Sequence, residues 1–195
     1  TAIMFLNRTE AGTRLAAKLK KFKQEPGIIM AVPRGGVPVA YAVALELGLP
    51  VELVLTKKIG HPQNKEYAIG AASLTDYFVV PHEGVSEDYI ESELLRVRGR
   101  LKEMQNTLQS DTIPETCEGK TLLIVDDGIA TGNTILGTVK LLRKSRPAKI
   151  VIAVPVASAP AVEMLEKEAD EVIAVLIPST FYGVGAFYED FRQVS

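Results

Sequence analysis

Five short stretches of the chain are almost entirely apolar, and they limit the fold more than any other feature of the sequence. A strand with one face in water alternates apolar and polar residues. These stretches do not alternate, which is typical of strands that are covered on both faces in a parallel sheet. The predicted strands are residues 28–32, 51–55, 121–125, 149–156 and 171–177.

Helical patterns separate these strands. Thr9 is expected to cap a first helix, a second runs from Val37 to a stop at Gly48, and a third contains Ile135 and ends before Pro147. Strands alternating with helices predict an α/β fold with a doubly wound, mostly parallel central sheet flanked by helices. With 195 residues, of which 47% are hydrophobic, we expect a single domain over residues 1–195 with its core at about 28–177.

One longer helix departs from this alternation. Ser86 is expected to cap it, and an apolar stripe follows at intervals of three and four residues: Ile90, Leu94, Val97, Leu101, Met104 and Leu108. The stripe lasts less than three heptads, so we expect it to pack on the sheet of its own domain. A seam between two copies in a homodimer is the alternative.

Charge and cysteine content exclude several classes of partner. The net charge of −2 gives no general reason to bind nucleic acid or an acidic membrane surface. The single cysteine, Cys117, cannot form an internal disulfide, and no apolar run approaches the roughly 18 residues of a membrane span. We therefore expect a cytoplasmic protein whose partners are small molecules.

The stretch "VDDGIATGNT" carries the strongest sign of chemistry. Asp126 and Asp127 follow a predicted strand directly, and a turn with Gly128 and Gly132 leads into a helix N-terminus, which favours anions. Two carboxylates would repel a phosphate unless a divalent cation or sugar hydroxyls accompany it. The pattern therefore predicts a site for a phosphorylated sugar with Mg²⁺. The plain alternative is that the two acids end the strand and cap the next helix.

This stretch resembles the phosphoribosylpyrophosphate (PRPP) signature of the type I phosphoribosyltransferases. The resemblance implies that Asp126 and Asp127 hold the ribose hydroxyls and Mg²⁺, directly or through water. It implies that the following loop wraps the 5′-phosphate, with the residues Ala130, Thr131, Gly132, Asn133 and Thr134.

A second stretch, "VPRGGVPVA", resembles the pyrophosphate loop of the same family. It implies that Arg34, Gly35 and Gly36 bind the pyrophosphate, and that the bond between Pro33 and Arg34 is a cis peptide. Lys57 and Lys58 resemble the basic residue that reaches the pyrophosphate in several members; an exposed lysine pair is the alternative.

Residues 59–73 lie where the family carries a mobile loop that closes over the reacting atoms. His61 is a candidate acid or base there and His82 a weaker one, although a lone loop histidine is more often incidental. The family also has a small hood made of terminal segments, for which residues 178–191 and the N-terminal segment are candidates. Phe181 or Tyr182 is expected to stack on the acceptor base; closing the core is the alternative for these rings.

The resemblance implies a Mg²⁺-dependent phosphoribosyltransferase that moves the 5-phosphoribosyl group of PRPP to a nitrogenous base and releases pyrophosphate. Asp126, Asp127 and Arg34 are its expected catalytic residues. One alternative is a PRPP-binding regulatory protein with little catalysis. Another is a phospho-accepting signalling receiver, which the motif's late position disfavours because 120 residues precede Thr121.

Overall fold

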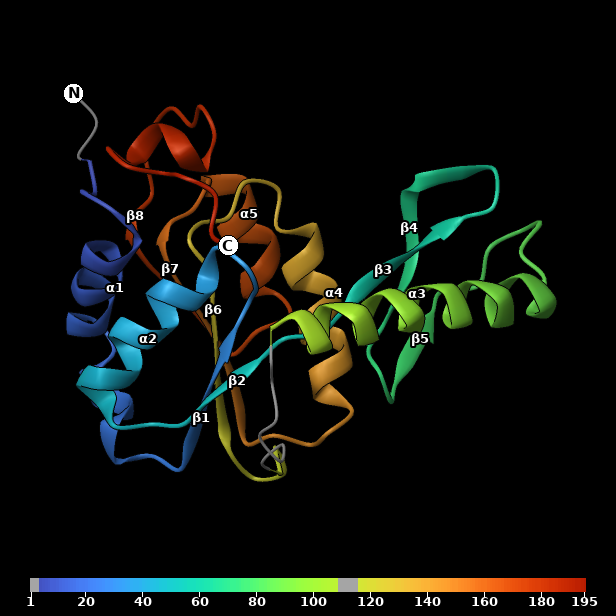
Figure 1. Ribbon diagram of the computed structural model, residues 1–195, viewed down its shortest axis with the longest axis horizontal. Helices are drawn as coiled ribbons and strands as arrows, with labels where there is room; N and C mark the ends of the chain where they lie inside the picture. The colour runs from blue at the N-terminus through green and yellow to red at the C-terminus, as the bar shows by residue number, and fades with distance from the viewer. Residues whose placement is uncertain (1–3, 109–115) are drawn as a thin grey trace. The chain divides into compact units, whose positions relative to one another are not determined.

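The computed structural model describes residues 4–108 and 116–195, and these form two compact units (Figure 1). Of the described residues, the first unit comprises 4–54, 116–132 and 145–195. The second comprises 55–108 and 133–144.

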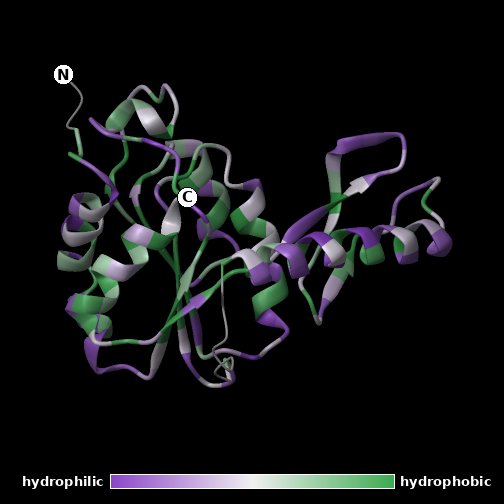
Figure 2. Cartoon of the chain, viewed as in Figure 1, coloured by the Kyte–Doolittle hydropathy of each residue, from purple (hydrophilic) through white to green (hydrophobic). Residues whose placement is uncertain are grey.

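The first unit contains a five-stranded parallel sheet in the order β2-β1-β6-β7-β8. All five predicted strands belong to it, so the prediction of a doubly wound parallel sheet is confirmed. The strands are largely hydrophobic (Figure 2), and the central strands β1, β6 and β7 are buried almost along their whole length, whereas the edge strands β2 and β8 are half-buried. The strands are β1 (Gly27–Ala31), β2 (Val51–Leu53), β6 (Thr121–Val125), β7 (Lys149–Val156) and β8 (Glu171–Leu176).

Helices cover both faces of this sheet. The chain leaves β1 through α2 (Gly36–Leu47) toward one edge and leaves β7 through α5 (Ala159–Glu166) toward the other. Because parallel crossovers are right-handed, the two helices lie on opposite faces. Helix α1 (Arg8–Ala17) packs beside α2, and the 3₁₀ helix η1 (Lys20–Gln24) follows it. The core between α1, α2 and the sheet contains Leu15, Leu19, Phe22, Val39, Val43, Ile29 and Leu123.

Two helix boundaries test the predicted signals. Gly48 ends α2 in a left-handed conformation with φ of 66°, as predicted. The prediction that Thr9 caps the first helix is wrong: Asn7 caps α1, and its Oδ1 accepts a hydrogen bond from the Glu10 N–H at 2.9 Å. Asn7 has the extended backbone that a cap requires, whereas Thr9 already lies in the first turn.

The two terminal segments of the first unit lie side by side. The Phe5 N–H donates to the Phe187 carbonyl at 2.7 Å, and the Glu189 N–H donates to the Phe5 carbonyl at 2.7 Å. The short helix η2 (Val184–Phe187) lies between β8 and this pairing, and Phe5 and Tyr188 are both buried. The start and end of the described chain are thereby fixed to each other.

The second unit contains an antiparallel sheet that the sequence patterns did not predict. Its strands are β3 (Lys57–His61), β4 (Asn64–Ala72) and β5 (Tyr77–Val79), in that order. Residues 59–73, expected to form a mobile loop, are mostly the β3–β4 hairpin with a turn at Pro62–Gln63. Whether this hairpin moves on binding stays a prediction. Helix α4 (Asn133–Arg143) also belongs to this unit and contacts β3 and β4.

The long helix α3 (Glu87–Thr107) packs on the antiparallel sheet. Ser86 caps it as predicted, since its side chain accepts a hydrogen bond from the Tyr89 N–H. The apolar stripe packs on a sheet of its own chain, although on this one rather than on the parallel sheet. Leu94, Val97 and Leu101 form one cluster with Ile59, Ile69 and Ala72. The homodimer alternative stays a prediction.

Glu93 is the one acidic side chain buried against this cluster among the described residues. Arg96 donates to its Oε2 at 2.8 Å and Lys65 to its Oε1 at 2.8 Å. The hydrogen bond from Arg96, followed by that from Lys65, lowers the pKa of Glu93 to about 2. Because folding depresses this pKa, the stabilisation is fully present above the ordinary value near 4.5 and is lost as the pH falls toward 2.

Glu93→Gln should therefore lower the free energy of unfolding by about 1–3 kcal/mol at pH 7, since it leaves Arg96 and Lys65 without a carboxylate. The difference from wild type should shrink between pH 4.5 and pH 2, where wild-type Glu93 itself becomes protonated. Denaturant unfolding at several pH values measures both effects. Glu91→Gln, at an exposed position of the same helix, is the control. An equal loss in the two variants would show that the Glu93 contacts contribute nothing specific.

Candidate functional site

Two loops meet at the point where the sheet reverses its winding. From β1 the chain crosses to β2 at one edge of the sheet. From β6, the other neighbour of β1, it crosses in the opposite direction to β7. Open α/β sheets bind ligands at the carboxyl ends of such a strand pair. Residues 32–36 follow β1 there, and residues 126–132 follow its neighbour β6. The sheet thus brings the two predicted motifs together, although about 90 residues separate them.

Glycine allows these loops to touch. A Cβ atom at Gly36 would lie 2.6 Å from the Val125 carbonyl oxygen, and one at Gly35 would overlap the Asp127 carboxylate. A side chain at Gly36 would therefore collide with backbone, and one at Gly35 would displace the Asp127 carboxylate. The peptide bond between Pro33 and Arg34 is cis, so that prediction is confirmed. Arg34 is exposed and forms no ion pair within the described part of the chain.

The two acids keep different environments. Asp126 Oδ1 accepts the backbone N–H of Asp127 at 2.8 Å, and Asp127 Oδ2 accepts Arg8 Nε at 3.0 Å. Burial, and then the adjacent Asp127 carboxylate, raise the pKa of the Asp126 carboxyl well above its usual range. The other oxygen of each carboxylate, Asp126 Oδ2 and Asp127 Oδ1, accepts no N–H donor within the described residues, although the two carboxyl groups lie close enough for one to share a proton with the other. The pair therefore offers one oxygen each to a ligand or cation.

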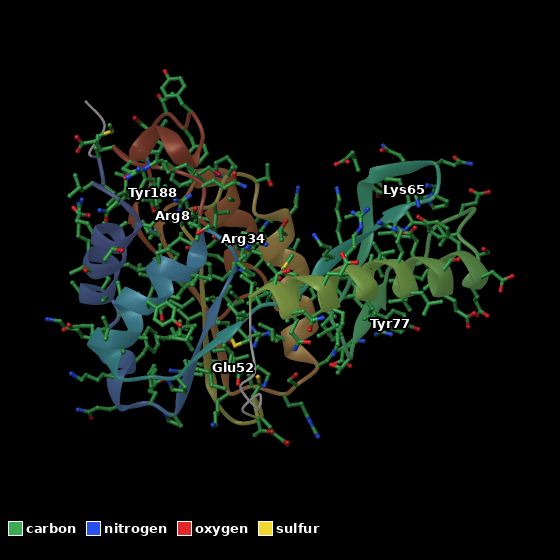
Figure 3. All side chains as sticks on the ribbon, in the orientation of Figure 1. Arg8, Arg34, Glu52, Lys65, Tyr77 and Tyr188 are labelled. Atoms are coloured by element: carbon green, nitrogen blue, oxygen red, sulfur yellow. The ribbon has the colours of Figure 1, made fainter. Side chains whose placement is uncertain are left out.

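Two residues at this site, Arg8 and Tyr188, were not found by sequence reasoning (Figure 3). Arg8 pairs with the Asp127 side chain, and the Tyr188 hydroxyl donates to the Asp127 carbonyl at 2.6 Å. Burial, and then Asp127, raise the pKa of Tyr188, so its hydroxyl remains a donor. Both residues lie far from Asp127 in sequence. Tyr188 falls within the candidate hood at residues 178–191, but neither residue was predicted to contact the acid pair. The only available signal was that a buried carboxylate requires a partner.

The predicted phosphate loop is anchored to the end of β7. The Ile129 N–H donates to the Val156 carbonyl at 2.9 Å, and the Ser158 hydroxyl donates to the Ala130 carbonyl at 2.6 Å. Ser158, which the motif analysis also missed, additionally caps α5. Gly132 has φ of 81°, a left-handed conformation that favours glycine.

Beyond Gly132, the predicted residues Asn133 and Thr134 begin α4, which belongs to the second unit, and both are exposed. Hydrogen bonds to the end of β7 therefore fix the backbone of the loop, while the Thr131 side chain stays exposed.

The remaining predicted cations and histidines lie in the second unit. Lys58 is exposed and pairs with Glu66 at 2.9 Å, whereas Lys57 is half-buried, because successive β3 residues face opposite sides. The ring centroids of His61 and His82 lie 6.3 Å apart, and the Tyr67 hydroxyl lies 3.2 Å from His82 Nε2. A role for the two lysines in pyrophosphate binding, or for His61 in catalysis, stays a prediction.

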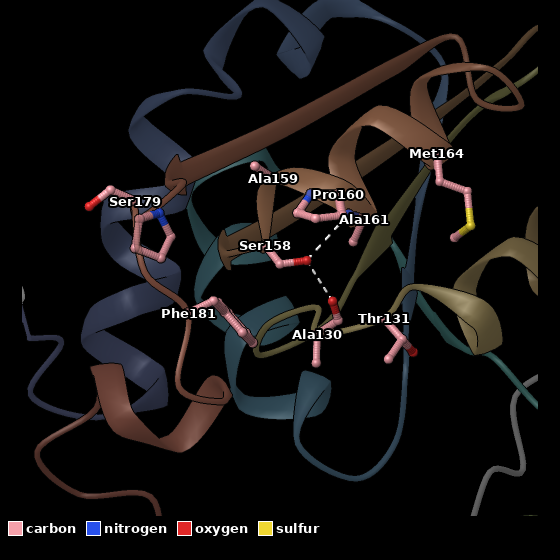
Figure 4. A pocket seen from close by; sticks show the side chains of 10 residues that line it. Ala130, Thr131, Ser158, Ala159, Pro160, Ala161, Met164, Ser179 and Phe181 are labelled. Carbon is pink, nitrogen blue, oxygen red and sulfur yellow. Dashed lines mark hydrogen bonds between the residues drawn. The ribbon is translucent and has the colours of Figure 1, made fainter.

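A pocket of about 560 Å³ adjoins the phosphate loop (Figure 4). It is lined by three segments of the first unit: Ala130–Thr131, Ser158–Ala161 with Met164, and the chain after β8 at Pro178, Ser179 and Phe181. Phe181 also stacks on Phe187, with ring centroids 5.6 Å apart. Tyr182 is 81% exposed and does not line this pocket. Of the two predicted base-binding rings, the structure places only Phe181 at a pocket.

Two kinds of feature are absent from the described residues. Across residues 4–108 and 116–195, no group of three or more His, Cys, Asp and Glu side chains is arranged to hold a metal ion. In the same ranges, no helix has both the length and the apolar character of a membrane span.

Comparison with known proteins gives consistent matches. The family described as phosphoribosyl transferase domain matches residues 6–192. A Mycobacterium tuberculosis protein that is provisionally named as a phosphoribosyl transferase is 33% identical over 199 residues, covering 98% of this chain and 44% of that protein. The chain therefore spans less than half the length of this curated relative.

Among solved structures, TT1426 from Thermus thermophilus superposes with a TM-score of 0.90 at 35% identity, covering 99% of this chain and 94% of that one. The Giardia lamblia APRTase complexed with 9-deazaadenine gives a TM-score of 0.51 at 13% identity, covering 88% and 81% of the two chains. The second similarity concerns the fold alone.

Proposed function

The chain belongs to the phosphoribosyl transferase domain family, and from that premise we propose that it transfers the 5-phosphoribosyl group of PRPP to a nitrogenous base and releases pyrophosphate, with Mg²⁺ as its cofactor. The observation that carries this proposal is the contact between the Arg34–Gly36 loop and the Asp126–Asp127 loop. One loop offers a guanidinium and the other two carboxylates, so together they suit a ligand that has both anionic groups and hydroxyls.

Each part of PRPP has a proposed binding group. The ribose hydroxyls donate to the free oxygens of Asp126 and Asp127, and the backbone of residues 130–134 binds the 5′-phosphate. Arg34, exposed and without an acidic partner among the described residues, binds the pyrophosphate. In the reaction the bond between ribose C1 and pyrophosphate breaks, and its electron pair leaves with pyrophosphate. A ring nitrogen of the base bonds to C1, and any proton on that nitrogen is released to solvent. Arg34 stabilises the charge that develops on the leaving group.

The acid pair also fits Mg²⁺, an ion that proteins commonly bind through one or two carboxylates together with substrate oxygens. One oxygen of each carboxylate accepts no N–H donor among the described residues, and Arg8 pairs with Asp127 but not with Asp126. Bound there, Mg²⁺ would supply positive charge to the ribose and pyrophosphate oxygens. A single cysteine fits a reducing compartment, so we place the protein in the cytoplasm.

The acceptor base is proposed to enter the pocket beside Ala130, which Phe181 also lines, and to stack on the Phe181 ring. This pocket and the loop that binds the 5′-phosphate share Ala130 and Thr131. A base in the pocket would therefore lie next to the bound sugar.

A pyrophosphate-release assay with PRPP, Mg²⁺ and a panel of purines and pyrimidines tests the proposal. We expect release with at least one base, and loss of release when EDTA removes Mg²⁺. Calorimetry with PRPP alone separates the outcomes. PRPP binding without turnover of any base would favour a regulatory protein, and the absence of PRPP binding would contradict both roles.

Phe181→Ala should raise the KM for the acceptor about tenfold, because it removes one aromatic stacking surface, while the affinity for PRPP stays near wild type. Phe181→Leu keeps apolar volume beside Phe187 without a ring, so it should show the same change in KM in a fully folded protein. Tyr182→Ala is the control, since that ring is exposed outside the pocket. Equal effects at Phe181 and Tyr182 would contradict the placement of the base.

A further inference from the structure

Arg8 is the first residue of α1, 119 residues before Asp127 in the sequence, yet it forms an ion pair with the Asp127 carboxylate, whose other side-chain neighbour is the adjacent Asp126. We propose that Arg8 is a positioning residue, which fixes Asp127 so that its free oxygen Oδ1 faces the ribose hydroxyls. This inference rests on the proposed function, because it assigns Arg8 a role in sugar binding.

Three contacts hold the guanidinium of Arg8 in one orientation. Nε donates to Asp127 Oδ2 at 3.0 Å, Nη1 donates to the Arg192 carbonyl at 2.5 Å, and Cζ lies 4.0 Å from the centre of the Phe191 ring. The Arg8 and Asp127 side chains are only 12% and 14% exposed. A planar guanidinium can make all three contacts at once, and a lysine ammonium cannot.

Two further hydrogen bonds restrain the backbone of Asp127. The Tyr188 hydroxyl holds the Asp127 carbonyl, and the Asp127 N–H donates to Asp126 Oδ1. The backbone of Asp127 is thus fixed at both its N–H and its carbonyl. The Asp127 carboxylate can then move only by rotation of the side chain, and the bond from Arg8 at 3.0 Å restricts this rotation, with Asp126 as its other side-chain neighbour.

Arg8 also lies against the proposed pyrophosphate loop. A Cβ atom at Gly35 would lie 3.4 Å from Arg8 Nε, besides overlapping Asp127 Oδ2. The ion pair therefore lies where the two loops touch, at the centre of the proposed site. An arginine that served only to attach α1 to the sheet would not need to contact this carboxylate.

Sugar binding by calorimetry, in Mg²⁺ buffer, tests the proposal with ribose 5-phosphate and its 2-deoxy and 3-deoxy analogues. Arg8→Met should weaken binding of ribose 5-phosphate by about 10- to 100-fold, the range for losing a hydrogen bond with a charged group. The affinity for at least one deoxy analogue should change much less, because that sugar lacks the hydroxyl that donates a hydrogen bond to Asp127. Arg8→Lys keeps the positive charge but loses the planar guanidinium with its several N–H donors. Its affinity for ribose 5-phosphate should therefore fall between those of wild type and Arg8→Met.

Arg14→Met is the matched control, since Arg14 lies on the same helix and stacks on the Phe5 ring at 4.7 Å without contacting Asp127. Its affinity and selectivity should stay at wild-type values. Circular dichroism checks folding, and Arg8→Lys alone carries the test if Arg8→Met does not fold.

An equal loss of affinity for all three sugars would overturn the proposal, because Arg8 would then act through the fold alone. Unchanged affinity and selectivity in both Arg8 variants would overturn it as well. If the wild-type protein bound neither these sugars nor PRPP, the proposed function itself would be wrong, and the role of Arg8 would fall with it.

Discussion

Replacing Asp126 and Asp127 together with asparagine should reduce the affinity for PRPP by about 100-fold or more, because the ribose hydroxyls lose two charged acceptors. Mg²⁺ binding should be weakened in parallel, since an amide oxygen carries no charge to hold the ion. Calorimetry with PRPP in the presence and absence of Mg²⁺ measures both losses. Asp76→Asn, at an exposed turn of the second unit, controls for the change in net charge.

The fold should survive this double replacement. Folding raises the pKa of Asp126, so its ionised form costs stability, and the cost grows as the pH rises above the ordinary range of an aspartate. At neutral pH, Asp126→Asn alone should therefore be at least as stable as wild type. Asp127→Asn removes the ion pair with Arg8 and should be the less stable single variant. Wild-type PRPP affinity in a folded double variant would remove the basis of the proposed function.

Gly132→Val should lower the affinity for ribose 5-phosphate by about 100-fold, comparable to losing two hydrogen bonds to a charged group. Valine at φ of 81° is strongly disfavoured, so the loop must rotate and turn its N–H groups away from the phosphate. A Cβ atom there would also lie 3.0 Å from Met164 Cε and 3.2 Å from Leu165 Cδ1, so the side chain enters the packing of α5. Titration with ribose 5-phosphate measures the effect.

Gly48→Val separates backbone strain from loss of the site. Gly48 has a similar φ of 66° and open space around its Cβ position, but it lies at the end of α2 that is remote from the carboxyl ends of the strands. Both variants should lose stability in thermal unfolding, and only Gly132→Val should lose affinity. Equal affinities in the two would place the 5′-phosphate elsewhere.

The parallel sheet could be predicted because each of its strands leaves a local mark, a continuous apolar run between breakers. The antiparallel sheet leaves no such mark: β4 begins with Asn64, Lys65 and Glu66, and only its second half is buried. Its strands are stabilised by contacts with α3 and α4, which lie far along the chain. Packing of this kind is a property of the folded unit and not of the segment.

The candidate site divides in the same way. Arg34, Asp126 and Asp127 lie in contiguous motifs, where residue type and spacing already indicate a phosphorylated ligand. Arg8 and Ser158 are brought to the site only by the tertiary structure. Arg8, at the start of α1, donates to Asp127, and Ser158 donates to the Ala130 carbonyl while it caps α5. Asparagine, serine and threonine near a helix start are nearly equivalent in sequence, which is why Asn7 and Thr9 could not be told apart.

The pairing of the two terminal segments determines when, during synthesis, the site can be completed. Synthesis on the ribosome produces Arg8 early and Asp127 much later, and Tyr188 and Arg192, which hold Asp127 and Arg8, are produced later still. Until those residues have left the ribosome, the nascent chain carries an acid pair without its full set of restraints. The site is therefore completed only after almost the entire described chain has been released.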